Sequence, residues 1–176
     1  WTNAALHVIG GNAQITNSSS DGLFTIEPGT HIQVNQSLST AGGRQVRWVG
    51  TEHQPIVFEG DPALSGISTL TVGSQDHAEI QYVNFNSVNL NYNITPEGET
   101  VLPALSHLNL KNSDMSVEIS QGTRVANARL ELDNLTIDNS SRTVAFGSPV
   151  SIVNHTDTGD LDEEELGVDV HIKNSY

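Results

Sequence analysis

The chain of 176 residues is long enough for one domain with a substantial core, although only 36% of its residues are hydrophobic and 5% are aromatic. Its formal net charge of −14 argues against nucleic acids and anionic membranes as partners, because both would repel it. It contains no cysteine, which excludes disulfides, thiolate chemistry and cysteine-based zinc sites, and no apolar run approaches the length of a membrane-spanning helix.

The N-terminal half shows short runs in which apolar and polar residues alternate, as β-strands require. Turn signals separate these runs at Glu27-Pro-Gly29, Ala41-Gly-Gly43 and Gly60-Asp-Pro62. A solenoid tolerates so polar a composition, since each of its turns needs only a thin apolar lining. We predict strands at residues 24–26, 31–34, 46–48, 56–58 and 70–72.

The C-terminal half repeats a short pattern of two apolar residues in alternation with polar ones, closed by an asparagine. The five asparagines are Asn84, Asn112, Asn134, Asn154 and Asn174, at intervals of 28, 22, 20 and 20 residues. A repeat of about 20 residues is typical of a solenoid with one repeat per turn. Positions two apart share a face of a strand, so we expect these asparagines to point inward and form a hydrogen-bonded ladder. The alternative is that asparagine merely marks loops.

The predicted fold is therefore all-β: a single-stranded, right-handed parallel β-helix with an internal asparagine ladder, forming one domain over residues 1–176. Its hand follows from the usual handedness of parallel crossovers. A β-sandwich is the main rival, because it also contains many short strands, but it predicts hairpins and no fixed period. Residues 94–103 carry two prolines and a glycine, so we expect a loop insertion there.

An acidic segment over residues 157–169 holds seven of the 21 acidic residues and no basic one. Asp157, Asp160 and Asp162 are candidate ligands for calcium, a cation that takes several oxygen ligands. Their spacing does not match an EF-hand loop, and a solvated acidic turn or a short helix over residues 160–166 is the alternative. Calcium is the one cofactor that the sequence suggests, because no His-x-x-x-His pair indicates zinc.

No motif identifies a catalytic residue: the chain has no phosphate-binding glycine loop and no nucleophile elbow. In the repeat frame, Lys111, Asp133 and Lys173 take equivalent outward positions, and Glu131 and His171 share the other outward position. Asp133 is then placed to pair with Lys111 on the adjoining turn. Such a stripe is usually a solvated face with weak ion pairs.

Three segments resemble bacterial right-handed parallel β-helix repeat proteins. Asp21-Gly-Leu-Phe-Thr-Ile-Glu-Pro-Gly-Thr30 is similar to that family's G-x-L-T-I-E-P-G-T segment. Gly50-Thr-Glu-His-Gln-Pro-Ile-Val-Phe-Glu-Gly60 matches the G-T-x-x-x-P-I-x-F-x-G segment that usually follows, and residues 78–85 look like the L-x-Y-V-x-F strand. The family's Trp-x-Gly-Ile is reduced here to Ser65-Gly-Ile67, which leaves the register of the middle turns open. The resemblance covers residues 1–90 and implies a secreted or cell-surface bacterial protein, often one module of a larger chain, without any particular activity.

The expected function is that of a non-catalytic extracytoplasmic surface module that binds a glycan or a protein, as in adhesion. A fragment of a polysaccharide-active enzyme, either a lyase or a glycoside hydrolase, is the first alternative, and a structural spacer is the second. The aromatic candidates for sugar stacking are Trp48, Tyr92 and Tyr176, with a place in the core as the alternative for Trp48. No cap follows the last predicted strand, so we expect contact with further modules of the same chain or end-to-end contact with another chain.

Overall fold

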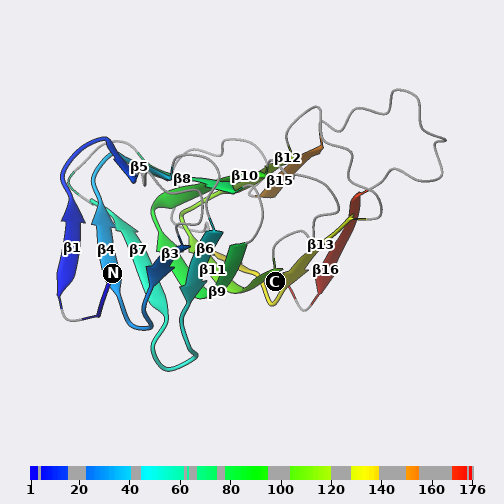
Figure 1. Cartoon of the computed structure of the whole chain (residues 1–176), viewed down its shortest axis with the longest axis horizontal. Helices are drawn as coiled ribbons and strands as arrows, with labels where there is room; N and C mark the ends of the chain where they lie inside the picture. Colours follow the sequence, from blue (N-terminus) through cyan, green and yellow to red (C-terminus); the bar gives the residue numbers. More distant parts are fainter. Residues whose placement is uncertain are drawn as a thin grey trace.

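The computed structural model describes residues 1–3, 5–15, 23–40, 45–61, 63, 67–74, 78–94, 104–119, 128–138, 150–154, 168–173 and 175. All regular structure in these ranges is β-strand, and the strands pair in parallel from one turn to the next (Figure 1). The prediction of an all-β parallel β-helix is confirmed. The described ranges contain no helix with the length and apolar character needed to cross a membrane.

Each turn of the solenoid passes through three faces. Face 1 consists of β3 (Leu23–Ile26), β6 (Gln45–Val49), the first halves of β9 (Ala78–Asn86) and β11 (Ala104–Lys111), β13 (Ala128–Asp133) and β16 (Val168–Lys173). Face 2 consists of β1 (Leu6–Ile9), β4 (His31–Val34), β7 (Ile56–Gly60), the second halves of β9 and β11, and β14 (Thr136–Asp138). These two faces form one 10-stranded sheet.

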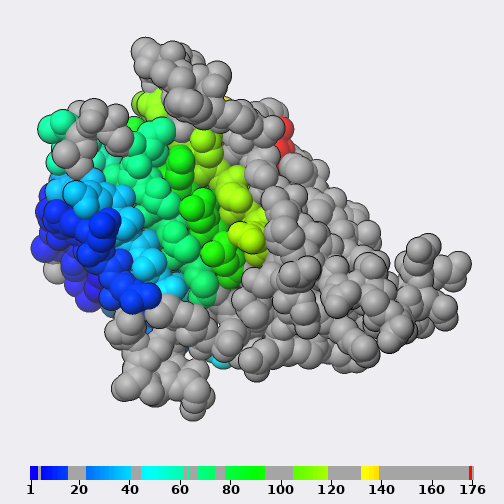
Figure 2. Space-filling view, turned by 90° about the horizontal axis from the view of Figure 1, so that it is seen from above, coloured from blue at the N-terminus to red at the C-terminus, as the bar shows by residue number. Residues whose placement is uncertain are grey.

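Face 3 is the separate 6-stranded sheet. It consists of β2 (Ala13–Ile15), β5 (Ser37–Thr40), β8 (Ser68–Ser74), β10 (Val88–Ile94), β12 (Met115–Ile119) and β15 (Val150–Asn154). Figure 2, which looks down from above, shows successive turns as adjacent bands that follow one another from the N-terminal end. The strands predicted in the N-terminal half correspond to β3, β4, β6, β7 and β8 and are confirmed.

Turn length varies along the solenoid. Leu6 pairs with His31 and Leu90 with Met115, an interval of 25 residues, whereas Ser68 pairs with Val88 at 20 and Ala128 with Val168 at 40. The segments between strands, rather than the strands themselves, absorb these differences. A constant interval of about 20 residues is therefore not what keeps the turns in register.

Apolar side chains stack inside the solenoid in columns. Ile32, Phe58, Phe85 and Leu110 occupy paired positions on successive turns of face 2, and each is fully buried. The rings of Phe58 and Phe85 are stacked with their centroids 5.5 Å apart. An aromatic pair of this kind contributes about 0.5–1.5 kcal/mol beyond the area that it buries.

Two of the aromatic residues considered for sugar stacking belong to this core. Trp48 is fully buried, and its ring lies 5.2 Å from that of Phe58 and 5.8 Å from that of Phe24. Tyr92 on β10 is also fully buried. The sugar-stacking role is therefore wrong for Trp48 and Tyr92, while Tyr176 lies outside the described residues.

Five corners between faces, among the described residues, each contain one residue other than glycine in the left-handed backbone conformation. Between faces 1 and 2 they are Tyr82, His107 and Asn134, with φ of 52°, 54° and 54°, and between faces 2 and 3 they are Ser87 and Asn112, with φ of 57° and 51°. Such a residue turns the chain and shifts the inward–outward alternation by one position. Gln81 and Tyr82 are accordingly both partly exposed, between the buried Ile80 and Val83.

This shift explains why the predicted asparagine ladder is wrong. Asn84 follows the corner at Tyr82, so it lies on the outer side of face 2, where it pairs with Asn109. Asn112 and Asn134 are corner residues, but they lie at different corners. Asparagine tolerates the left-handed conformation better than most residues, so Asn112 and Asn134 reflect turns, whereas Asn84 lies within β9.

The last two asparagines do not restore the ladder. Asn154 ends β15 on face 3, opposite Ile119, and Asn174 lies outside the described residues. The frame holds for one pair of turns, because Leu130 pairs with Val170 and Leu132 with Ile172. Of the predicted outward stripe, Glu131 and His171 share a position, as do Asp133 and Lys173. The predicted pairing of Lys111 with Asp133 is wrong, since Lys111 lies opposite Asp138.

We expect Gly50→Ala to lower the free energy of unfolding by about 1–3 kcal/mol, the usual cost of overpacking. A Cβ at Gly50 would lie 2.5 Å from the Tyr82 carbonyl oxygen and 2.9 Å from the Ile56 nitrogen, and backbone atoms cannot move aside cheaply. Urea unfolding measures the effect. Gly11→Ala is the control, because a Cβ there meets nothing within 4 Å, and its change should stay within about 1 kcal/mol. Equal stability of both variants would contradict the close packing of this corner.

Candidate functional site

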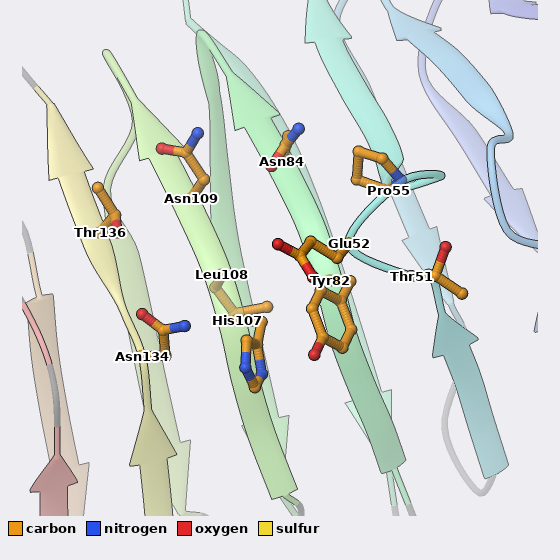
Figure 3. A pocket seen from close by; sticks show the side chains of 10 residues that line it. All are labelled: Thr51, Glu52, Pro55, Tyr82, Asn84, His107, Leu108, Asn109, Asn134 and Thr136. Atoms are coloured by element: carbon orange, nitrogen blue, oxygen red, sulfur yellow. The ribbon is translucent and has the colours of Figure 1, made fainter.

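A groove with a volume of about 430 Å³ lies along the corner between faces 1 and 2 (Figure 3). It crosses the strands of several turns, so its length follows the stacking direction of the solenoid. Its lining comes from the corner residues, from the outer side of face 2 and from one loop. The residues are Thr51, Glu52, Pro55, Tyr82, Asn84, His107, Leu108, Asn109, Asn134 and Thr136.

One wall of the groove is formed by the corner residues Tyr82, His107 and Asn134. The rings of Tyr82 and His107 are stacked, with centroids 4.1 Å apart and an angle of 19° between their planes. For Tyr82, a bulky residue, a positive φ is a true outlier, whereas histidine adopts it more readily. A left-handed backbone in a residue other than glycine costs about 1–3 kcal/mol. Two rings are thus kept at positions where asparagine, as at Asn134, would fit with less strain.

The opposite wall is a column of outward side chains on face 2. Asn84 pairs with Asn109, and Asn109 pairs with Thr136, so two amides and a hydroxyl follow one another at the inter-strand spacing of about 4.8 Å. No hydrogen bond joins these three side chains to another described residue. Each amide therefore offers both donors and an acceptor to a ligand. Leu108, only 2% exposed, lies between the two walls.

A loop over residues 50–55 closes one end of the groove. Val49 pairs with Gln81 and Ile56 pairs with Val83, so this whole loop stands opposite the single residue Tyr82. Thr51 and Gln54 donate their backbone N–H groups to each other's carbonyl oxygens, both at 3.1 Å. The Gln54 N–H also lies 3.0 Å from Thr51 Oγ1.

The same loop is tied to the preceding turn, because the Gly29 N–H donates to the Gln54 carbonyl oxygen at 3.0 Å. Gly29 has a φ of 76°, a conformation that glycine adopts without cost. These bonds hold the loop backbone in place. The loop carries Glu52, an exposed residue that lines the groove together with Tyr82 (Figure 3).

The chemistry of the lining is mostly uncharged. Among the ten described lining residues, Glu52 has the only carboxylate, and none is lysine or arginine. The hydroxyls, amides, two rings and one carboxylate make a polar surface with an aromatic edge. Such a set of a few placed polar groups beside aromatic side chains is typical of small-molecule sites.

The candidate calcium ligands Asp157, Asp160 and Asp162 lie outside the described residues, as does the helix considered for residues 160–166. In the described part of the chain, no group of three or more histidine or acidic residues is placed to hold a metal ion. Of the predicted insertion at residues 94–103, only Ile94, the last residue of β10, is described.

Two ion pairs lie on the outer surface of faces 1 and 2. His31 Nε2 is 2.9 Å from Glu59 Oε2, and Arg47 Nε is 3.2 Å from Glu79 Oε2. All four side chains are more than 40% exposed, and exposed pairs contribute at most about 1 kcal/mol. They stabilise neighbouring turns weakly and do not line the groove.

The sequence did not point to the groove. The alternation of Ile80 and Tyr82 predicts an inward side chain for Tyr82, and no motif marks His107 or Glu52. The signal for the corner is weak, since tyrosine rarely adopts a positive φ and histidine, although it does so more often than most residues, is common elsewhere too. Comparison with protein families, curated proteins and solved structures finds no match to this chain, so the function must be inferred from geometry.

We expect Tyr82→Asn with His107→Asn to change the free energy of unfolding by less than about 1 kcal/mol. Asparagine relieves backbone strain at both corners, and this offsets a lost ring stacking of about 0.5–1.5 kcal/mol. Phe85→Ala, in the core, should cost about 3–5 kcal/mol. Urea unfolding of the three proteins compares them. A double variant as unstable as Phe85→Ala would mean that the two rings serve the fold.

Proposed function

We propose that this chain is a non-catalytic surface module that binds a glycan in the groove. The single observation that carries the proposal is the stack of Tyr82 and His107, held on strained backbone beside a column of unbonded amides. Backbone strain of this kind is retained mostly where function needs it. Asparagine would make the same corner with less backbone strain, although it would lose the ring stacking.

The lining of the groove matches both the apolar faces and the hydroxyl groups of a sugar. The C–H faces of a pyranose are apolar and pack against aromatic rings, whereas its hydroxyls both donate and accept hydrogen bonds. Tyr82 and His107 supply rings, and Asn84, Asn109 and Thr136 supply amides and a hydroxyl. The side chains of neighbouring turns repeat at about 4.8 Å, so successive sugar residues along the groove meet the same kind of partner.

Binding without cleavage fits this lining better than catalysis. Hydrolysis of a glycosidic bond uses two carboxyl groups about 5–10 Å apart, and the described lining residues include only that of Glu52. A lyase needs a basic residue to abstract a proton, and no lysine or arginine is among the described lining residues. These features favour a binding module over a polysaccharide-active enzyme.

An extracellular location on a bacterial surface is part of the proposal and rests on the resemblance of residues 21–30 and 50–60 to the β-helix repeat proteins. Both segments serve the same corner, between faces 1 and 2. In the first, Thr30 is fully buried and its Oγ1 donates to the Glu27 carbonyl oxygen at 2.7 Å. In the second, Thr51 organises the loop that closes the groove. The paired motifs thus mark corners in adjacent turns, which supports the likeness.

A glycan array followed by titration calorimetry tests the function. We expect the protein to bind at least one glycan class, and Tyr82→Asn with His107→Asn to weaken that binding at least about tenfold, equivalent to 1.4 kcal/mol. Asn91→Ala is the control: Asn91 pairs with Thr71 and Ser116 on face 3, away from the groove. Absence of binding to any glycan, or equal loss in the control, would refute the proposal.

A further inference from the structure

We infer that the groove selects its glycan by charge: it takes uncharged or amino-bearing sugars, and Glu52 excludes uronates and other acidic glycans. This inference rests on the proposed glycan binding and adds the class of ligand. It concerns the end of the groove that the loop over residues 50–55 closes.

The charge in the groove has one sign. Of the described lining residues, Glu52 carries the only carboxylate, and the other side chains that can titrate are Tyr82 and His107. Without a lysine or arginine in this lining, a carboxylate on the ligand would meet Glu52 and no permanent positive charge. Like charges placed opposite each other across an interface discriminate strongly against the wrong partner.

The rest of the chain strengthens this discrimination. Its net charge of −14 repels anions at long range, whereas Glu52 acts at short range on the sugar that reaches the closed end. The amides of Asn84 and Asn109 accept any sugar hydroxyl and carry no charge. They supply affinity without regard to charge, so the selection depends on Glu52.

The loop holds Glu52 where it can act. The paired bonds between Thr51 and Gln54, and the bond from Gly29, fix the backbone on both sides of the residue. Glu52 and Tyr82 both line the groove at this end (Figure 3). An amino group on the terminal sugar would find a counter-charge there, and a neutral hydroxyl would find a hydrogen-bond acceptor.

The test compares glycans that differ only in charge. Oligomers of glucose, galactose and mannose are each presented in neutral, amino and uronic acid forms, and affinities are measured for the wild type and variants in low and high salt. We expect the wild type to bind a neutral or amino form at least about tenfold more tightly than the matching uronate, and added salt to narrow this ratio.

Substitutions at Glu52 then test whether this residue causes the preference against uronates. We expect Glu52→Gln to strengthen uronate binding at least about threefold while neutral binding changes less than about twofold, and Glu52→Lys to reverse the preference between amino and uronate forms. Glu118→Gln is the matched control, because it removes the same charge from an exposed residue of β12 on face 3.

The outcomes separate the two proposals. If the wild type binds neither these glycans nor any glycan of the array, the glycan-binding function itself is overturned and the charge selection with it. If it binds uronates as tightly as their neutral counterparts, or if Glu52→Gln and Glu118→Gln shift the ratio equally, the function stands and the selection by Glu52 is wrong.

Discussion

In a parallel β-helix each inward side chain packs on the side chain at the same position of the turns before and after it. Here Phe58 lies on Phe85, and Ile56 lies opposite Val83, both in fully buried columns. A turn can therefore change its length only where the chain leaves the strands. This is why the interval between paired residues ranges from 20 to 40 without disturbing the core.

The regular stacking of the strands requires strained backbone at several corners. A corner made by one residue must adopt the left-handed conformation, and the following strand then resumes alternation shifted by one position. Asn112 and Asn134 meet this demand with a residue that tolerates it, whereas Tyr82 and His107 meet it with rings. Because the core constrains none of these side chains, corner positions are free to vary, and under the proposed function the strained rings of Tyr82 and His107 are the ones that meet the ligand.

The sequence predicted the fold from the alternating strands together with the recurring asparagine frame, and the strands of the N-terminal half were found where expected. The prediction of the asparagine ladder was wrong because a corner lies inside the repeated segment. The frame counted residues two apart as sharing a face, but the corner at Tyr82 interrupts that count, so Asn84 faces outward. Only between β13 and β16 did the frame give the true register, because no corner lies within the paired segments.

The groove could not be predicted from the sequence, because no motif within one turn encodes it. It arises from the different corner lengths of neighbouring turns. In the turn of β6 and β7 the corner between faces 1 and 2 consists of residues 50–55. In the turns of β9 and β11 the same corner consists of Tyr82 alone and His107 alone. The longer corner rises above the shorter ones and becomes an end wall, and the outward amides on the following turns become a side wall. A solenoid with identical turns would have a smooth ridge here. Unequal corners turn that ridge into a groove, and Glu52, carried on the longer corner, is the residue to which we assign the selection of the ligand.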